Sequence, residues 1–359
     1  MSENVKTMKA LVFEDFNKMV VQEYPIPEPA DNEVLIRVAY CGICATDYDN
    51  FKGISSFAKE GKLLFPLRWG HEWSGRICKV GKNVTKFKVG DRVTNNGRVT
   101  CGECSECKAG RRFNCKNLRS IGTVGKNIWP GGMAEYTTLP EVDTLLLNDA
   151  VSFQAACAME PATIALNGLR DIPIEGSTVL VIGSGPIGVM GAHLAKALGA
   201  KKVIIAARKK PKLDLALKLG ADVAINTTEE DIYQALSECT DGSLADVVLD
   251  TAGEASYTEH LTQLLRKGGH FTSVAFYNRY SNVNFDDIVL NKMTFYGRSG
   301  SNICTPQLMD LISEGKADVT PIISSMIDFY KDGPTCMDFY EGQKSVGTKV
   351  LIKVYGEDA

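Results

Sequence analysis

Histidine and tryptophan are scarce in this sequence, with four and three copies among 359 residues. Long apolar runs are absent as well, since none approaches the roughly 20 residues that a helix needs to cross a bilayer. The N-terminal residues MSENVKTMKALVF carry charges where a signal peptide has its apolar core. There are no internal repeats and no low-complexity segments. These absences argue against a membrane protein and predict a globular protein of the cytoplasm.

A strong excess of one charge is also missing. The chain has 40 basic and 43 acidic residues and a net charge of −3, so it lacks a general attraction to nucleic acid or anionic membranes. Its length predicts two or three domains, and a hydrophobic content of 44% is ordinary for an enzyme. Eleven cysteines without a secretion signal indicate reduced thiols or metal ligands rather than a disulfide framework.

The stretch 178–200, TVLVIGSGPIGVMGAHLAKALGA, has the pattern of a nucleotide-binding unit. A short aliphatic strand runs directly into a glycine-rich turn, and a helical pattern follows. In such a unit the first glycine permits the turn, the second lets a pyrophosphate approach the backbone, and the third lets helix and strand pack closely. We predict a dinucleotide site at the turn residues Gly183, Ser184, Gly185, Pro186, Ile187 and Gly188.

The hydrophobic pattern divides the rest of the chain into domains. Alternating runs and glycine-rich turns predict a β-rich domain over 1–155. Short hydrophobic strands then alternate with helical segments, which predicts an α/β domain with a doubly wound parallel sheet over 156–297. The strand-like run TKVLIKV near the end predicts that the segment 298–359 returns to the β-rich domain.

Four cysteines fall within the short segment CGECSECKAGRRFNC, at the spacing C-x2-C-x2-C-x7-C. Four thiolates can close a tetrahedral shell around zinc and leave no open position, so this zinc would be structural. A nucleic-acid zinc ribbon fits the acidic chain poorly, and an iron–sulfur site has no evident redox partner. The predicted ligands are Cys101, Cys104, Cys107 and Cys115.

A second metal site is predicted from dispersed residues. Catalytic zinc takes three protein ligands and keeps one position open. Cys44 follows a strand, and His71 and Glu72 stand in the motif Gly-His-Glu. Neighbouring strand side chains point to opposite faces, so both could reach one metal only if the backbone bends at Gly70. Glu160 is the alternative carboxylate ligand, and either glutamate could complete the shell.

The second strand of the α/β domain gives the cofactor prediction. An NAD site has a carboxylate there for the ribose 2′-hydroxyl, but this sequence has Ala207 followed by Arg208, Lys209 and, slightly later, Lys212. A guanidinium can pair with a 2′-phosphate, so we predict NADP(H) rather than NAD(H). A solvated basic run is the alternative. The nicotinamide is expected at strand ends near Thr251, Ala275 and Phe276.

Together, the motifs CGICATD, GHEWSG, VGDRV, MEPATIALNGL and VLVIGSGPIG and the four-cysteine segment resemble the zinc-containing medium-chain dehydrogenase/reductases of the alcohol dehydrogenase superfamily. The resemblance is to the polyol (sorbitol or L-iditol) and threonine dehydrogenase branch. It implies a GroES-like β domain, a Rossmann domain and an active-site zinc in the cleft between them. It also implies two zinc ions per chain and a homodimer or homotetramer.

The resemblance assigns roles to single residues. Cys44, His71 and Glu72 resemble the catalytic zinc ligands, and Glu160 occupies the position of a fourth ligand. Thr46 matches the hydroxyl that begins the proton relay. Arg298 resembles the arginine that polyol enzymes place near substrate hydroxyls, and Tyr48 is a further polar candidate for the substrate pocket. The sequence departs from many relatives at Asp49, where they have a relay histidine.

The predicted reaction is reversible oxidation of a secondary alcohol, a polyol or sugar alcohol, to its ketone, with hydride transfer to or from NADP(H). Zinc would act as a Lewis acid on the alcohol oxygen, and Thr46 would pass the proton outward. Several alternatives remain open at this stage: a threonine-type or other amino-alcohol substrate, a sugar phosphate, and NAD as cofactor. A non-catalytic NADPH-binding protein would be expected to lose its zinc ligands, and none is lost.

Overall fold

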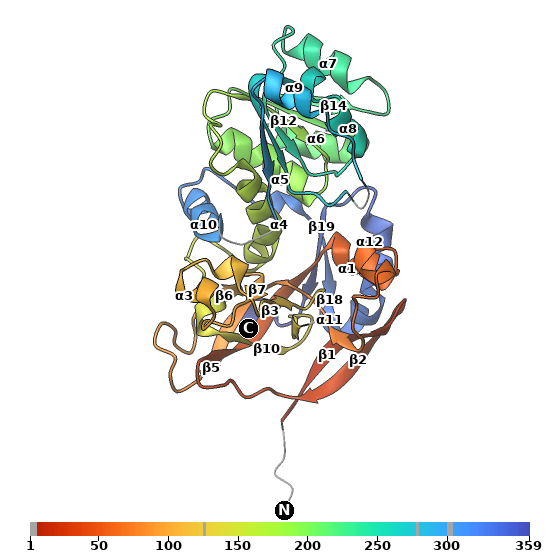
Figure 1. Cartoon of the computed structure of the whole chain (residues 1–359). Helices are drawn as coiled ribbons and strands as arrows, with labels where there is room; N and C mark the ends of the chain where they lie inside the picture. Colours follow the sequence, from red (N-terminus) through yellow and green to blue (C-terminus); the bar gives the residue numbers. More distant parts are fainter. Residues whose placement is uncertain (1–5, 125–126, 278–279, 300–303) are drawn as a thin grey trace, which may run out of the picture. The chain divides into compact units, whose positions relative to one another are not determined.

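The computed structural model describes residues 6–124, 127–277, 280–299 and 304–359 (Figure 1). The chain forms two compact units, one of Met1–Glu160 with Ile323–Ala359 and the other of Pro161–Ile322. The C-terminal return to the β-rich unit therefore begins at Ile323 and not at Arg298. Residues 298–322 belong to the α/β unit instead because their contacts are there: Arg298 donates to the carbonyl of Arg170 at 3.0 Å, and the N–H of Asp318 bonds His193 at 3.0 Å.

The first unit is built on an antiparallel sheet that the C-terminal strands extend. In the described residues this sheet has seven strands in the order β11-β6-β5-β3-β19-β18, with β10 also paired to β3. Its strands are β3 (Glu33–Ile43), β5 (Glu72–Val80), β6 (Arg92–Asn95), β10 (Tyr136–Pro140), β11 (Thr144–Leu146), β18 (Ile323–Asp328) and β19 (Lys349–Lys353). β19 lies antiparallel to β3, so Val350 near the C-terminus is paired with Ile43, just before the start of α1.

Smaller elements complete this unit. β1 (Thr7–Asp15), β2 (Lys18–Pro25) and β4 (Leu67–Arg68) form one small sheet, and β7 (Arg98–Val99), β8 (Arg119–Ile121) and β9 (Ile128–Trp129) form another. The short helices are α1 (Ala45–Phe51), α2 (Ser56–Lys59), α3 (Ser105–Lys108), α11 (Phe329–Asp332) and α12 (Cys336–Gln343). Aromatic side chains fill the core between these parts, where the rings of Phe13 and Trp69 stack at 4.1 Å.

The second unit is a parallel sheet with the strand order β14-β13-β12-β15-β16-β17 in its described residues. Its strands are β12 (Thr178–Ile182), β13 (Lys202–Ala207), β14 (Val223–Asn226), β15 (Ala245–Asp250), β16 (Leu265–Ser273) and β17 (Thr294–Gly297). The order reverses between β12 and β15, as in dinucleotide-binding folds. The predicted Rossmann sheet and the β-rich domain are thereby confirmed.

Helices connect the strands of the second unit. They are α5 (Pro186–Ala197), α6 (Lys210–Lys218), α7 (Ile232–Cys239), α8 (Ala255–Glu259), α9 (Phe285–Leu290) and α10 (Thr305–Ser313). Helix α4 (Phe153–Leu169) is almost entirely apolar and buried, and the boundary between the units passes through it, after Glu160. None of the helices in the described ranges is long and apolar enough to cross a membrane.

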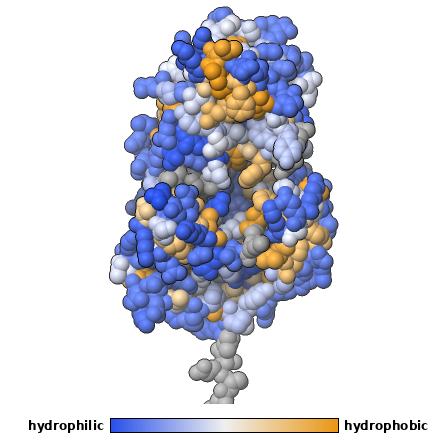
Figure 2. All heavy atoms as spheres, in the orientation of Figure 1, coloured by the Kyte–Doolittle hydropathy of each residue, from blue (hydrophilic) through white to orange (hydrophobic). Residues whose placement is uncertain are grey.

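Helix α9 has an apolar surface. The side chains of Phe285, Val289 and Leu290 are 72%, 73% and 70% exposed. Apolar residues gather over this part of the second unit in Figure 2. A contiguous exposed patch of large apolar side chains marks an interaction surface more often than apolar residues scattered singly do.

Candidate active site and metal centres

The predicted zinc triad is assembled within the first unit. One ligand atom each from Cys44, His71 and Glu72 lies within 4.8 Å of the others. Cys44 follows β3 and stands at the N-terminus of α1, while Glu72 is the first residue of β5, opposite Gly42 of β3. Sulfur, nitrogen and oxygen donors at this spacing fit a zinc ion with an open position.

The backbone bends at Gly70, as the triad requires. Gly70 has a φ of +101°, and a Cβ atom there would lie 2.6 Å from the sulfur of Cys41. Because β5 begins only at Glu72, His71 lies in the turn and does not alternate with Glu72 along a strand. This turn lets two neighbouring residues reach one metal, so Glu72, rather than Glu160, is grouped with Cys44 and His71.

A buried aspartate supports the triad from α1. Asp47 is fully buried, accepts a hydrogen bond from the N–H of Cys44 at 3.0 Å, and has a carboxylate oxygen 3.7 Å from Nδ1 of His71. Burial raises the pKa of Asp47 to about 6, against the opposing effects of His71 and of that N–H. Burial acts to lower the pKa of His71, but Asp47 and Cys44 outweigh it and the pKa lies well above its usual range. Asp47 therefore acts on His71 electrostatically, a contact that the sequence analysis did not predict.

Lys349 is a second residue that the sequence analysis missed. Its Nζ lies 2.6 Å from both carboxylate oxygens of Glu72, and the two side chains are 2% and 1% exposed. Burial acts to lower the pKa of Lys349, but the charge of Glu72 outweighs it and raises that pKa. A lysine within the apolar run of β19 was the available signal, since a lysine is rarely buried without a partner.

Glu160 lies close to the triad without joining the group of three. Burial and the negative charge of Glu72 raise the pKa of Glu160, while His71 opposes the shift. The helix α4 supplies Glu160 immediately before Pro161. Its electrostatic coupling to Glu72 and His71 keeps it a candidate for an additional or exchanging ligand, and that role stays a prediction.

The other predicted residues of this region lie on α1. Thr46 is half-buried, one residue from the buried Asp47. Tyr48 is buried against α12, with its ring 5.5 Å from that of Tyr340 and the Nζ of Lys344 4.4 Å from its centre. Asp49 pairs with Lys344 at 3.6 Å. The roles predicted for Thr46, Tyr48 and Asp49 in proton transfer and substrate binding stay predictions.

The four-cysteine segment forms the second metal centre. One sulfur each from Cys101, Cys104, Cys107 and Cys115 lies within 4.8 Å of the others. Hydrogen bonds from the backbone N–H groups of Cys107 and Lys116 lower the pKa of Cys104 to about 6. A thiolate is the form that binds zinc, and four thiolates around one point leave no open position. The donor set therefore fits a structural zinc.

The glycine-rich turn in the second unit has the predicted geometry. Gly183 has a φ of +104°, and a Cβ atom at Gly188 would lie 2.0 Å from the carbonyl oxygen of Gly183. A Cβ atom at Gly185 would meet no protein atom within 4 Å, which leaves room for a pyrophosphate at the N-terminus of α5. Pro186 and Ile187 begin α5. The turn fits a dinucleotide.

A pocket of about 320 Å³ extends from this turn along the carboxyl ends of β12, β13 and β15. It is lined by residues that include Gly183, Ser184, Gly185, Ala207, Arg208, Lys209, Lys212, Thr227, Thr251, Glu254 and Tyr257. Three basic residues that follow β13 line the pocket, and among its lining residues in the described chain the one acidic residue is Glu254, beyond β15. Ala275 and Phe276 follow β16 and are not among the lining residues of the described chain, whereas Thr227 and Tyr257 are lining residues that we did not predict.

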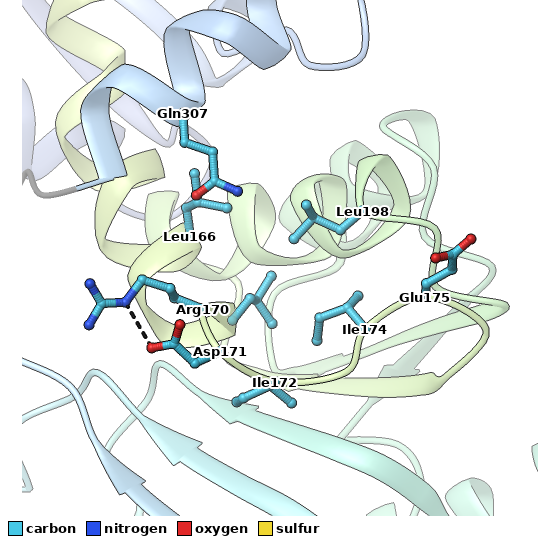
Figure 3. Close-up of a pocket in the computed structure, with 9 residues that line it drawn as sticks. Leu166, Arg170, Asp171, Ile172, Ile174, Glu175, Leu198 and Gln307 are labelled. Atoms are coloured by element: carbon cyan, nitrogen blue, oxygen red, sulfur yellow. Dashed lines mark ion pairs between the residues drawn. The ribbon is translucent and has the colours of Figure 1, made fainter.

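Arg298 is held inside the second unit. Its Nη2 donates to the carbonyl of Arg170 at 3.0 Å and lies 3.5 Å from Asp171, and its guanidinium lies over the ring of Tyr296. The neighbouring pocket, of about 390 Å³, is shown in Figure 3, where Leu166 and Leu198 point into it while Arg170 pairs with Asp171 at its edge. The substrate contact predicted for Arg298 stays a prediction.

Comparison with known families matches both units. The model of the alcohol dehydrogenase GroES-like domain matches residues 30–149, and that of the zinc-binding dehydrogenase domain matches residues 186–314. The chain belongs to the zinc-binding alcohol dehydrogenase family. As a member of this family it is an oxidoreductase of the alcohol dehydrogenase type. The first matched segment contains the triad and the four cysteines, and the second begins at the first residue of α5.

Individual relatives cover most of the chain. It is 33% identical to D-arabitol-phosphate dehydrogenase of Enterococcus avium over 327 residues, and this alignment covers 89% of this chain and 90% of the relative. It is 31% identical to L-threonine 3-dehydrogenase of Rhizobium etli strain CIAT 652 over 316 residues, and this alignment covers 87% of this chain and 90% of the relative. The structure of a zinc-binding dehydrogenase from Sinorhizobium meliloti 1021 bound to NADP superimposes with a TM-score of 0.85 at 27% identity, covering 97% of this chain and 100% of that one.

Proposed function

We propose that this dehydrogenase interconverts a polyol or sugar alcohol, in free or phosphorylated form, and its ketone, with NADP(H) as the hydride carrier. The observation that carries the proposal is the convergence of Cys44, His71 and Glu72 within 4.8 Å. Three donors of these types suit a zinc ion that keeps one position for a substrate oxygen. The relative that acts on D-arabitol phosphate supports a polyol rather than a simple alcohol.

The protein's own residues would bind the metal and move the proton. Cys44, His71 and Glu72 would hold the catalytic zinc, which supplies Lewis-acid polarisation of an alcohol oxygen when bound. Glu160 is a further ligand candidate. Thr46, one residue from Asp47 at the start of α1, would accept the substrate proton, with Tyr48 or Asp49 beyond it. Arg298 and Tyr48 are proposed to contact substrate hydroxyls.

A substrate panel tests the reaction class. The purified enzyme, with its zinc content measured, is assayed by cofactor fluorescence against D-arabitol and other polyols, their phosphates, and L-threonine. We expect the largest kcat/KM for a polyol or its phosphate. A larger value for L-threonine would favour the second candidate, which the likeness to L-threonine 3-dehydrogenase supports. If the enzyme turns over neither polyols nor L-threonine, the polyol proposal is refuted.

The preference for NADP(H) is proposed from the pocket beside β13. Arg208, Lys209 and Lys212 line it, and Ala207 stands where an NAD site has its carboxylate. Replacing Arg208 by serine removes one charge-assisted interaction with the 2′-phosphate. We expect kcat/KM for NADPH to fall by about 10- to 100-fold and that for NADH to change little.

Lys218 supplies the matched control for this experiment. It is an exposed basic residue at the end of the same helix, α6, and does not line the pocket. Lys218→Ser should leave the ratio of NADPH to NADH activity unchanged. Similar kcat/KM values for NADH and NADPH in the unmodified enzyme would contradict the proposed selectivity.

We also propose a homo-oligomer. β17 ends the parallel sheet within the described chain, and the exposed apolar side chains of α9 lie in the same unit. A second copy that extends the sheet at β17 and covers α9 would bury both the open edge of that strand and the apolar patch. Sedimentation of the unmodified protein should give at least a dimer, and Val289→Lys should shift it toward a monomer. We propose a reducing compartment such as the cytoplasm, which suits eleven free cysteines, four of them in the thiolate centre.

A further inference from the structure

The end of β15 carries a buried carboxylate that is hydrogen-bonded from two segments. Asp250, the last residue of β15, is 1% exposed. Its Oδ1 accepts from the N–H groups of Ala252 and Gly253, at 2.9 and 3.1 Å. Its Oδ2 accepts from the hydroxyl of Ser273 at 3.3 Å and from the hydroxyl of Tyr277. A charged acceptor strengthens each of these bonds, so Asp250 joins the segment after β15 to the segment after β16.

The segment after β15 forms part of the cofactor pocket. Thr251 and Ala252 line this pocket beside the glycine-rich turn. Thr251 donates both its N–H and its hydroxyl to the carbonyl of Ile182, at 2.9 and 2.8 Å. Its hydroxyl oxygen would lie 2.6 Å from a Cβ atom at Gly183. The pocket wall at Thr251 is therefore fixed to the end of β12, one residue from Asp250.

The segment after β16 is held close to the same wall. The carbonyl of Asp250 accepts from the N–H of Val274 at 3.1 Å. A Cβ atom at Gly253 would lie 2.7 Å from the carbonyl oxygen of Phe276, so the two segments approach closely. Burial and the charge of Asp250 raise the pKa of Tyr277, which keeps its hydroxyl protonated as a donor. The bond from Tyr277 therefore ties the segment after β16 to Asp250.

We propose that Asp250 is a positioning residue for the nicotinamide cofactor and acts through the hydroxyl of Tyr277. This inference rests on the proposed function. The sequence predicts the nicotinamide near Ala275 and Phe276, directly before Tyr277, whereas the pocket at the glycine-rich turn would take the phosphates and the adenosine. By joining the two segments, Asp250 keeps the sites for the two halves of the dinucleotide at a fixed separation. A site that is already ordered binds its ligand more tightly.

The first test compares the intact cofactor with a fragment that lacks nicotinamide. Dissociation constants of NADPH and 2′-phospho-ADP-ribose, and of NADH and ADP-ribose, are measured calorimetrically in the zinc-loaded enzyme without an alcohol. We expect Tyr277→Phe to weaken binding of the intact cofactor about 10-fold and that of the fragment less than about 2-fold. The lost bond holds the segment predicted to contact nicotinamide. Because the comparison is made within each pair, it does not depend on which cofactor or which alcohol the enzyme prefers.

Tyr233→Phe is the matched control. Tyr233 is half-buried on α7 in the same unit, its ring centre lies 5.7 Å from that of His260, and it is not one of the described residues that line the pocket. Its substitution should change neither dissociation constant. If Tyr277 had only a structural role, its substitution would lower the free energy of unfolding and leave the ratio of the two constants unchanged. That result, or equal weakening of cofactor and fragment, would overturn the proposal.

A double-mutant cycle tests whether Asp250 acts through Tyr277. Asp250→Asn keeps the size of the side chain and removes its charge. We expect it to weaken cofactor binding at least as much as Tyr277→Phe does, and the double variant to bind no more weakly than Asp250→Asn alone. Independent effects that multiply would separate the two residues and contradict the proposal. If the unmodified enzyme binds neither cofactor, the proposed cofactor site itself is wrong, which is a different result from an unchanged Tyr277→Phe.

Discussion

Replacing Cys44 by serine is expected to abolish turnover while the protein stays folded. Cys44 provides the only sulfur of the catalytic group, within 4.8 Å of the ligand atoms of His71 and Glu72. Loss of the metal removes several kcal/mol of transition-state stabilisation, so kcat/KM should fall by about 10³-fold or more. Zinc measured by atomic absorption should fall from about two ions per chain to about one, because the four-cysteine centre is separate.

Cys78 is the matched control for this substitution. It lies on β5, the strand that begins with Glu72, but its sulfur donates to the carbonyl of Leu35 and belongs to neither metal group. Cys78→Ser should keep both zinc ions and near-normal activity. If Cys44→Ser retained activity, or lost no zinc, the assignment of the catalytic site would be wrong.

Replacing Lys349 by methionine is expected to destabilise the first unit strongly. The Nζ of Lys349 neutralises the buried carboxylate of Glu72, with both oxygens at 2.6 Å. Methionine would leave that charge buried without a partner, which typically costs about 3–5 kcal/mol. The loss in the free energy of unfolding should be larger in chelator-treated enzyme than in zinc-loaded enzyme, since bound zinc would itself compensate Glu72. Urea unfolding followed by circular dichroism measures both.

Two further variants show whether the charge is the cause. Lys353 lies on the same strand, β19, but is exposed, so Lys353→Met should change the free energy of unfolding by no more than about 0.5 kcal/mol. In the chelated protein, the double variant Lys349→Met, Glu72→Gln should be more stable than Lys349→Met alone because the unpaired charge is gone. Equal stability of Lys349→Met and the unmodified protein would contradict the role assigned to the pair.

The four-cysteine group and the glycine-rich turn could be predicted from the sequence because each depends on residues that are close together in the chain. The four cysteines fall within one loop, and the turn from Gly183 to Gly188 lies between a strand and a helix that the pattern of apolar residues indicates. Their geometry follows from a few consecutive backbone angles. The parallel sheet was predicted in the same way, because strands and helices of regular length alternate through the second unit.

Long-range partners could not be predicted from spacing. Lys349 and Glu72 are far apart in the chain and meet because β19 lies against β3, next to β5. Asp47 was given no role in the sequence analysis, and only the tertiary structure places its carboxylate 3.7 Å from Nδ1 of His71. The boundary at Ile323 was also missed, because residues 298–322 carry no change of pattern and are held in the second unit by contacts with Arg170 and His193.

The sequence by itself determined the family and the two kinds of unit, and it predicted the donors of both metal centres and the glycine-rich turn for the cofactor. These features are local, and residue type and spacing encode them directly. Only the tertiary structure groups the donor atoms of Glu72 with those of Cys44 and His71, because that grouping depends on the backbone bend at Gly70. It also placed Lys349 against Glu72, since burial and pairing arise only when distant strands are brought together.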